Sequence, residues 1–287
     1  MTVRAALAEG SGTLEGSCPG SPFLDAALLL ARAMGLSKDR LLASMPDEVA
    51  APALETYRAL VARRSSGEPV AYLVGYKEFY GRRYAVDSRV LIPRPDTELL
   101  VEVALSLLAR TGGGAHRPAR CHDAFTGSGC IGITLAAERP DILISVSDAS
   151  EGALAVCRTN ALAILGRELD ARTGDMLSAA TAPLDLVTAN PPYVSSSFTD
   201  GMMAEGSREP RLALDGGEAG LDLYPGLAAE AFALLADGGA LAVEIGEEQG
   251  PAVRALLEAA GFGEVAVHGD LAGYDRVVSG VKHAVRR

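Results

Sequence analysis

The stretch Asn190-Pro191-Pro192-Tyr193 carries the residue types needed to hold a planar –NH2 group. It follows an apolar run at residues 184–189, which predicts a buried strand. Because proline fixes φ and lacks an N–H, the two prolines leave backbone carbonyls outside any helix or sheet ladder. The Asn190 side-chain oxygen and one such carbonyl, most simply that of Pro191, can then accept both N–H groups of an amide or amine. Tyr193 offers a ring face for stacking.

A turn without a chemical role is the alternative for this stretch. An isolated Asn-Pro dipeptide usually marks only a turn. The complete tetrapeptide at a strand end, downstream of a glycine-rich loop, favours a catalytic site instead.

The glycine-rich loop spans residues 126–132, between a candidate strand at 121–125 and a helical pattern at 131–138. Asp148 ends the next candidate strand and follows Gly127 by 21 residues. This spacing is typical of folds that bind a nucleotide, in which the glycines pass close to the ligand and the acid binds ribose hydroxyls. The glycines of the G-x-G-x-x-G pattern are Gly127, Gly129 and Gly132.

Other roles remain open for these residues. Gly129 and Gly132 could serve only close packing of a helix on a strand, and Asp148 could cap a helix before Ser150. The glycine pattern by itself also fits a dinucleotide. Hydride transfer gives no role to an Asn-Pro-Pro-Tyr turn, whereas methyl transfer does, so the sequence favours S-adenosylmethionine as the cofactor.

Around these motifs, from about residue 22 to 281, the chain resembles the bacterial peptide chain release factor N5-glutamine methyltransferases. The Asn-Pro-Pro-Tyr motif alone would also fit adenine N6 and guanine N2 methyltransferases of DNA and RNA. The blocks at 92–98 and 216–222 are much narrower and carry the resemblance to this family. The matching stretches are residues 69–75, 91–98, 123–129, 190–193, 209–210, 213–217, 220–224, 244–246 and 275–278.

The resemblance implies a class I methyltransferase that moves a methyl group from S-adenosylmethionine to the side-chain amide nitrogen (N5) of a glutamine. The acceptor would be the glutamine of the Gly-Gly-Gln motif of class I peptide chain release factors, which act in translation termination. The implied catalytic residues are Asn190, Pro191, Pro192 and Tyr193. The implied cofactor-binding residues are Asp123, Ala124, Phe125, Thr126, Gly127, Gly129, Asp148, Asp175, Met176 and Asn190.

The chain departs from the family pattern in two places. The family has Asp-Leu-Gly-Thr-Gly-Ser-Gly at residues 123–129, so Phe125 replaces a glycine that lies close to the cofactor. We expect the Phe125 ring to pack into a neighbouring helix or strand; the alternative is a ring that narrows the pocket. Pro225 follows Tyr224 where the family tends to have arginine.

Two residues near the motifs have plain structural alternatives. Arg94 lies between two prolines, and we expect it to pair with Glu98 or Asp96, so it is left out of the catalytic residues. Asp175 is expected to flank the adenine with Met176, but an ordinary turn aspartate is the alternative.

Composition limits the classes of partner and site. The chain has 287 residues and is 48% apolar, enough for one large and one small domain, with no stretch long and uncharged enough to span a bilayer. A net charge of −11 argues against duplex nucleic acid as the main partner and suits a basic protein substrate. Four cysteines without a C-x-x-C pair and four histidines without ligand spacing predict no metal site and a reducing, cytoplasmic location.

The order of patterns predicts an α/β fold: a doubly wound, Rossmann-like methyltransferase sheet with a small N-terminal helical bundle. The alternation of strands and helices indicates a parallel sheet with its ligand at the carboxyl ends of the strands. We expect an N-terminal helical substrate-recognition domain at residues 1–70, a β-hairpin linker at 71–94 and an S-adenosylmethionine-binding methyltransferase domain at 95–287.

Within these parts, two segments are expected to be irregular. Residues 9–20 are rich in glycine and serine and predict a loose segment before a helix that starts at Pro22. Residues 111–118 predict a glycine-rich loop before the first strand of the sheet.

Three functions therefore stay open. The first is methylation of the release-factor glutamine. The second is a nucleic-acid amino methyltransferase, which would require a basic RNA- or DNA-binding region that the N-terminal helices do not supply. The third is a non-catalytic relative that binds S-adenosylmethionine, suggested only by Phe125.

Overall fold

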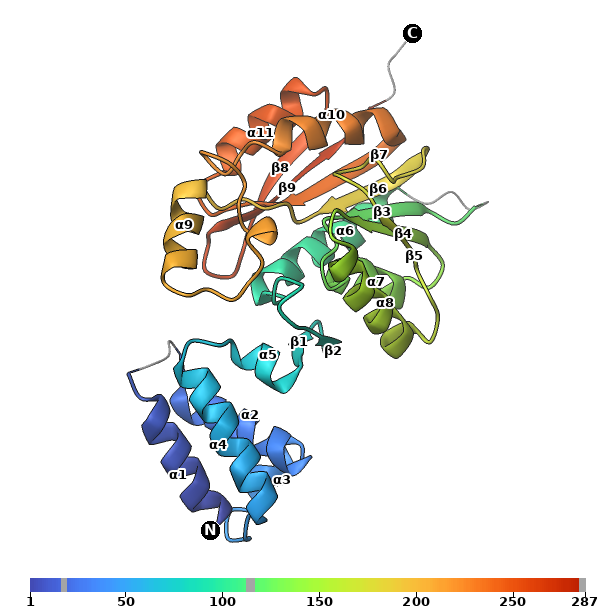
Figure 1. The fold of residues 1–287 in the computed structure, drawn as a ribbon. Helices are drawn as coiled ribbons and strands as arrows, with labels where there is room; N and C mark the ends of the chain where they lie inside the picture. The colour runs from blue at the N-terminus through green and yellow to red at the C-terminus, as the bar shows by residue number, and fades with distance from the viewer. Residues whose placement is uncertain (17–19, 112–116, 284–287) are drawn as a thin grey trace. The chain divides into compact units, whose positions relative to one another are not determined.

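A computed structural model gives the fold of the protein and describes residues 1–16, 20–111 and 117–283 (Figure 1). Cys18 and most of the loop predicted at 111–118 lie outside the described residues. Within the described ranges, none of the helices combines the length and the apolar character that crossing a membrane requires.

The chain divides into two compact units, which differ in part from the three parts expected from the sequence. The first unit contains residues 1–76 and 202–208, and the second contains residues 77–201 and 209–287. Most of the predicted linker, from residue 77 onward, falls in the second unit. A short segment far along the chain belongs to the first.

The N-terminal part of the first unit is helical and has its own apolar core, to which Leu7, Leu29, Leu30 and Tyr57 contribute. Three of its helices begin at a hydroxyl side chain that accepts a backbone N–H, as expected for helix caps. The helices are α1 (Val3–Leu14), α2 (Pro22–Met34), α3 (Lys38–Ala43), α4 (Ala51–Ser65) and α5 (Val70–Val74).

The prediction of a loose segment at residues 9–20 was wrong for its first part, because α1 continues to Leu14. Gly10 lies inside this helix, where a Cβ would come 1.8 Å from the Tyr57 hydroxyl oxygen. The glycine thus permits close packing of α1 on α4 and does not mark a flexible segment. The predicted helix start at Pro22 is confirmed.

The hairpin consists of β1 (Tyr76–Phe79) and β2 (Arg82–Ala85). The first residues of the predicted hairpin region form α5 instead, which ends at Gly75 with a φ of 86°. Aromatic and β-branched residues favour strands only weakly, and the contacts of Leu73 and Val74 in the apolar core outweigh that preference.

The second unit is built on a seven-stranded sheet with the order β5-β4-β3-β6-β7-β9-β8. The strands from β5 to β7 are parallel, whereas β9 runs antiparallel to both β7 and β8. The wholly parallel sheet indicated by the sequence is corrected at this end, because a short turn joins β8 directly to β9. The strands are β3 (Arg120–Ala124), β4 (Leu143–Asp148), β5 (Asp170–Thr173), β6 (Leu184–Ala189), β7 (Leu235–Glu244), β8 (Gly263–Gly269) and β9 (Asp275–Val281).

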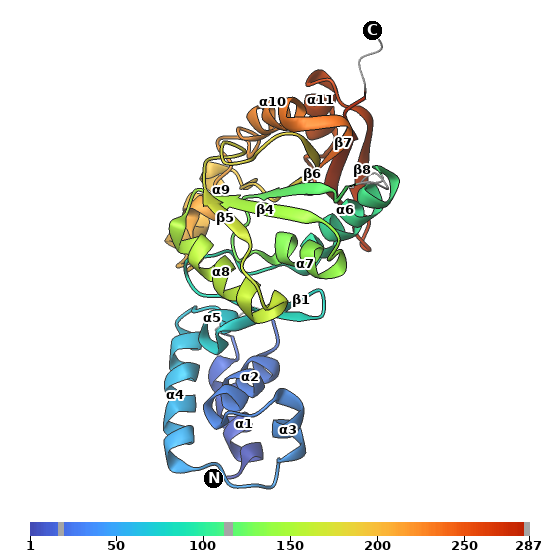
Figure 2. The ribbon, with the colours of Figure 1, turned by 90° about the vertical axis from the view of Figure 1, so that its right-hand side faces the viewer.

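Helices cover both faces of this sheet, as Figures 1 and 2 show. One apolar cluster lies between the sheet and α6 (Glu98–Thr111), α7 (Cys130–Glu138) and α8 (Glu151–Leu165). A second cluster lies between the sheet and α10 (Tyr224–Leu234) and α11 (Gly250–Ala259). The remaining elements are η1 (Pro95–Thr97), α9 (Ser196–Ala204) and η2 (Arg211–Ala213).

The strand register brings four strand ends to one edge of the sheet. Ala124 of β3 pairs with Ser147 of β4 and with Ala189 of β6, and Ala189 pairs with Val243 of β7. The residues that follow these pairs therefore lie side by side at the carboxyl edge, where open α/β sheets bind their ligands. They are Phe125, Asp148, Asn190 and Glu244.

Candidate active site

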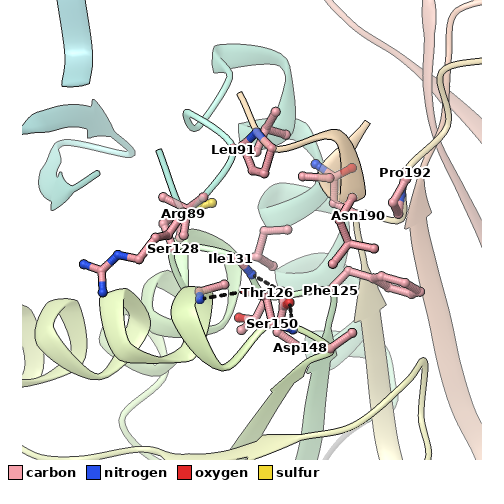
Figure 3. Close-up of a pocket in the computed structure, with 18 of the residues that line it drawn as sticks. Arg89, Leu91, Phe125, Thr126, Ser128, Ile131, Asp148, Ser150, Asn190 and Pro192 are labelled. Carbon is pink, nitrogen blue, oxygen red and sulfur yellow. Dashed lines mark hydrogen bonds between the residues drawn. The ribbon is translucent and has the colours of Figure 1, made fainter. Parts of the chain in front are cut away.

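A pocket opens at this carboxyl edge, entirely within the second unit (Figure 3). Asn190, Pro192 and Phe125 are drawn on one side of the pocket and Arg89 on the opposite side. Of the residues predicted from the sequence, those that line it are Phe125, Thr126, Gly127, Asp148, Asp175, Asn190 and Pro192. Those that lie outside its lining are Asp123, Ala124, Gly129, Met176, Pro191 and Tyr193.

Asp123 lies beneath the glycine loop and is fully buried. Its carboxylate accepts hydrogen bonds from the hydroxyls of Thr126 (2.6 Å) and Thr188 (2.7 Å) and from the Gly132 N–H (3.2 Å). Burial raises the pKa of Asp123 to about 6, although these hydrogen bonds act in the opposite direction. In this arrangement Asp123 fixes the loop from below, so a direct contact with the cofactor remains only a prediction.

Glycine is needed at different positions of the loop for different structural reasons. A Cβ on Gly129 would lie 2.7 Å from the Cys157 Sγ, and one on Gly132 would lie 2.7 Å from Val146 Cγ1. Gly132 therefore allows the close helix–strand packing that was the alternative from sequence, whereas Gly129 allows close packing of the loop on α8. Gly127 has a φ of 54° and no atom within 4 Å of an ideal Cβ, so its backbone borders open space in the pocket.

Asp148 connects the loop to the next helix. Its carboxylate accepts the N–H of Gly127 and that of Ser150, each at 2.8 Å, while Ser150 itself caps α8. Burial raises the pKa of Asp148, and the two backbone hydrogen bonds lower it. Asp148 also lines the pocket, so its remaining lone pairs can accept hydrogen bonds from a ligand.

Phe125 occupies the left-handed backbone region with a φ of 55°. This conformation suits glycine and costs about 1–2 kcal/mol for a residue with a Cβ. The half-buried ring contacts the apolar cluster under α10 and α11 and also lines the pocket. The expected packing against a neighbouring element and its alternative, a ring at the pocket wall, are therefore both present.

The Asn190–Tyr193 turn is held by the loop at residues 214–220. The Val194 N–H donates to the Leu214 carbonyl (2.9 Å), and the Gly216 N–H donates to the Val194 carbonyl (2.8 Å). A Cβ on Gly216 would lie 2.4 Å from the Pro192 carbonyl oxygen, so only glycine fits there.

A side chain secures the end of the same turn. The Gln249 Nε2 donates to the Tyr193 carbonyl at 3.1 Å and to the Gly220 carbonyl at 3.2 Å. A Cβ on Gly220 would lie 2.1 Å from the Tyr193 carbonyl oxygen. The Pro192 carbonyl therefore packs against Gly216 and the Tyr193 carbonyl is bonded to Gln249, whereas Pro191 lies outside the pocket lining, so its carbonyl stays only a predicted acceptor.

Arg94 was expected to pair with Glu98 or Asp96, and that prediction was wrong. Its guanidinium pairs with Glu209, 115 residues away in sequence, and Glu209 also accepts the Ile92 N–H at 3.0 Å. Glu209 reaches both residues because the chain after α9 returns to the pocket rim, which no local pattern reveals. Asp175 is exposed and lines the pocket, whereas Met176 is half-buried with a φ of 46°.

Comparison with known proteins identifies the family. Residues 5–75 match the PrmC N-terminal domain and residues 102–206 match the methyltransferase small domain. A release factor glutamine methyltransferase from Cereibacter sphaeroides is 41% identical over 257 residues, 89% of this chain and 89% of the relative. Relatives with the same name from Moorella thermoacetica (39% over 282 residues, 96% and 97%) and Burkholderia pseudomallei (42% over 269 residues, 90% and 91%) are equally similar. This chain belongs to the release factor glutamine methyltransferase family.

Solved structures agree with the fold of this family member. The catalytic domain of hMettl16 in complex with MAT2A 3′UTR hairpin 6 has a TM-score of 0.54 at 12% identity and covers 79% of this chain and 83% of its own. A methyltransferase from Pyrococcus furiosus has a TM-score of 0.51 at 13% identity and covers 79% and 98%. These likenesses concern the fold alone, and the predicted α/β methyltransferase fold is confirmed.

Glu244 was not among the site residues predicted from the sequence and entered only through the family resemblance at residues 244–246. It ends β7 with 2% of its surface exposed, and its carboxylate accepts a hydrogen bond from the Tyr193 hydroxyl at 3.3 Å. The signal that could have revealed it is an acid after an apolar run, as at Asp148. Among residues 1–16, 20–111 and 117–283, no group of three or more His, Cys, Asp or Glu is arranged to hold a metal ion.

Proposed function

We propose that this protein transfers a methyl group from S-adenosylmethionine to the side-chain amide nitrogen (N5) of the glutamine in the Gly-Gly-Gln motif of class I peptide chain release factors. The observation that carries the proposal is the Asn190 side chain, an acceptor at the pocket on a turn held by the 214–220 loop; the Pro191 carbonyl is the proposed second acceptor. Family membership supports the same substrate.

The pocket suits the cofactor by the chemistry of its donors and acceptors. The Asp148 carboxylate would accept the ribose hydroxyls, and Gly127 leaves open space for close approach of the ligand to the backbone. Asp175 and Met176 would flank the adenine, and the Phe125 ring would form an apolar wall. Bound S-adenosylmethionine supplies a methyl group that is already activated on a sulfonium.

The residues of the chain have mainly to orient the acceptor. A carboxamide nitrogen is a weak nucleophile because its lone pair is delocalised into the carbonyl. Asn190 Oδ1 and the Pro191 carbonyl would accept its two N–H groups and turn the lone pair toward the methyl group. Such alignment can lower a barrier by about 7–11 kcal/mol in favourable cases. The same oxygens stabilise the positive charge that develops on nitrogen, and the nitrogen loses its proton after methyl transfer.

The partner is a protein and the compartment is the cytoplasm, where release factors act. The net charge of −11 favours encounter with a basic, RNA-binding protein and opposes a duplex nucleic acid as substrate. The N-terminal helices, predicted at residues 1–70, are proposed to recognise the protein substrate.

Incubation with labelled S-adenosylmethionine tests the proposal. A class I release factor, tRNA and duplex DNA are offered in parallel, together with a release factor whose acceptor glutamine is replaced by alanine. We expect label on the release factor only, and none on the alanine variant. Equal or stronger labelling of RNA would replace the proposal with a nucleic-acid methyltransferase, and no transfer to any acceptor would favour the non-catalytic alternative.

A further inference from the structure

Glu244 is a buried acid next to the proposed catalytic turn, and the function proposed above gives it no role. Only 2% of its surface is exposed, and one carboxylate oxygen, Oε2, forms no hydrogen bond with any residue that the structure describes. A buried polar atom without a partner is costly and is usually retained for a reason. The other oxygen, Oε1, accepts from the Tyr193 hydroxyl at 3.3 Å.

The surroundings fix the Glu244 backbone and leave its carboxylate facing Asn190. The Tyr224 hydroxyl donates to the Glu244 carbonyl at 2.9 Å, which holds the end of β7. The side chains of Thr97 and Asn190 lie within hydrogen-bonding reach of the carboxylate. Asn190 thus lies between the pocket, which it lines, and a buried acceptor at the end of the neighbouring strand β7.

The orientation of the Asn190 amide decides whether the site can hold its substrate. The oxygen and nitrogen ends of an asparagine amide are similar in size, but only the oxygen can accept an N–H from a substrate amide. A neutral partner behind Asn190 could donate or accept and would allow both orientations. An ionised carboxylate can only accept, so it selects the orientation in which Nδ2 points back and Oδ1 points into the pocket.

We propose that ionised Glu244 is a positioning residue that accepts the Asn190 Nδ2–H and thereby presents Asn190 Oδ1 to the substrate –NH2 group. The part that concerns the substrate rests on the proposed function. The orientation of Asn190 by Glu244 is a property of the protein alone and can be measured without a substrate.

Protonation of Glu244 should reverse this preference. Burial raises the pKa of Glu244 to about 7, and nearby Asp96 adds to the rise, whereas the polar side chains of Thr97, Tyr193 and Asn190 act in the opposite direction. A protonated carboxyl group can donate to Asn190 Oδ1 and draw it away from the pocket. The titratable and charged groups that face this pair are Asp96, Cys130, Tyr193 and Tyr224, with Arg94 and Arg276 acting on Tyr193.

The composition of the chain allows a direct test by NMR. Asn160 and Asn190 are its only asparagines, so a sample labelled at asparagine shows two side-chain amide groups. Asn160 is an internal control, because its amide is bonded to Ala85 and to the Ser128 carbonyl, away from Glu244. We expect the Asn190 amide signals to shift with a midpoint near pH 7 and the Asn160 signals to stay unchanged. Asn190 signals that do not change between pH 6 and pH 8 would overturn the proposal.

Kinetics of two variants separate positioning from general damage to the fold. With a pKa of about 7, the wild-type kcat should fall about tenfold from pH 8 to pH 6. Glu244→Gln should remove this step and lower kcat at pH 8 about tenfold or more, with the KM for S-adenosylmethionine within about twofold. Tyr224→Phe, which loses only the bond to the Glu244 backbone, should lower Tm but keep the step.

Each outcome bears on one of the two claims. A Glu244→Gln protein that keeps the wild-type pH step, or a Tyr224→Phe protein that loses it, would contradict the positioning role. If the wild-type protein methylates no release factor, the proposed function fails, while the Asn190 titration still decides whether Glu244 orients that side chain.

Discussion

Replacing Phe125 by glycine restores the residue that the family pattern has at this position and tests how the protein tolerates a phenylalanine there. The substitution relieves the left-handed backbone, with a φ of 55°, which is worth about 1–2 kcal/mol. It also removes a half-buried ring. Full burial of a phenylalanine is worth about 1.5–3 kcal/mol, so about half of that is lost. The added conformational freedom of glycine in the unfolded chain lowers the free energy of unfolding by about a further 0.5–1 kcal/mol.

These effects nearly cancel, so the free energy of unfolding should change by no more than about 1.5 kcal/mol. Because the ring forms only one wall of the pocket, the affinity for S-adenosylmethionine should change less than about tenfold, or about 1.4 kcal/mol. Calorimetric titration of both proteins with the cofactor measures the affinity, and denaturant unfolding measures the stability.

Phe125→Ala is the matched control for this prediction. Alanine loses the ring but keeps a Cβ in the left-handed region, so Phe125→Ala should be less stable than Phe125→Gly by about 1 kcal/mol. An alanine variant as stable as the glycine variant would refute the argument from backbone strain. A native chain that binds no cofactor, with binding restored by Phe125→Gly, would contradict the active-enzyme proposal.

The remaining predictions concern the Asn190–Tyr193 turn. Asn190→Ala should lower turnover about 10²–10³-fold, because one preorganised acceptor is lost, and leave cofactor affinity within a few-fold; loss of cofactor binding would show a structural role. Tyr193→Ala should be milder in the same assay, since Tyr193 lies outside the pocket lining and its ring accepts no N–H. Gly216→Ala should displace the Pro192 carbonyl, 2.4 Å from the new Cβ, and lower turnover by up to about 10²-fold. Gly201→Ala in α9 meets no atom within 4 Å and should stay fully active; equal loss in both variants would contradict the packing argument.

The parts of the site that the sequence predicts are those with a local signature. The 21-residue spacing from Gly127 to Asp148 reflects one strand–loop–helix–strand unit, and the structure joins these two residues by a hydrogen bond. The Asn190–Tyr193 stretch is recognisable because no common structural need demands that tetrapeptide. The family resemblance added further residues to the predicted cofactor site, such as Asp175, which has no distinctive local pattern.

Contacts between distant parts of the chain could not be predicted from the sequence. The Arg94–Glu209 pair spans 115 residues, and the role of Gly216 against the Pro192 carbonyl depends on how two loops meet. Glu244 looks like the end of an ordinary strand until its neighbours Thr97 and Asn190 are known. The loose segment predicted at residues 9–20 was wrong for a similar reason, because the close approach of Tyr57 to Gly10 is a tertiary contact that the glycine-rich sequence does not reveal.

The most direct test of the proposed function is to locate the methyl group by mass spectrometry. A class I release factor is incubated with the protein and S-adenosylmethionine, digested, and the peptide that contains Gly-Gly-Gln is fragmented. We predict one added methyl group on the side-chain nitrogen of that glutamine, and none when the Asn190→Ala protein is used. A methyl group on another residue, or an unmodified peptide beside methylated RNA, would contradict the proposal.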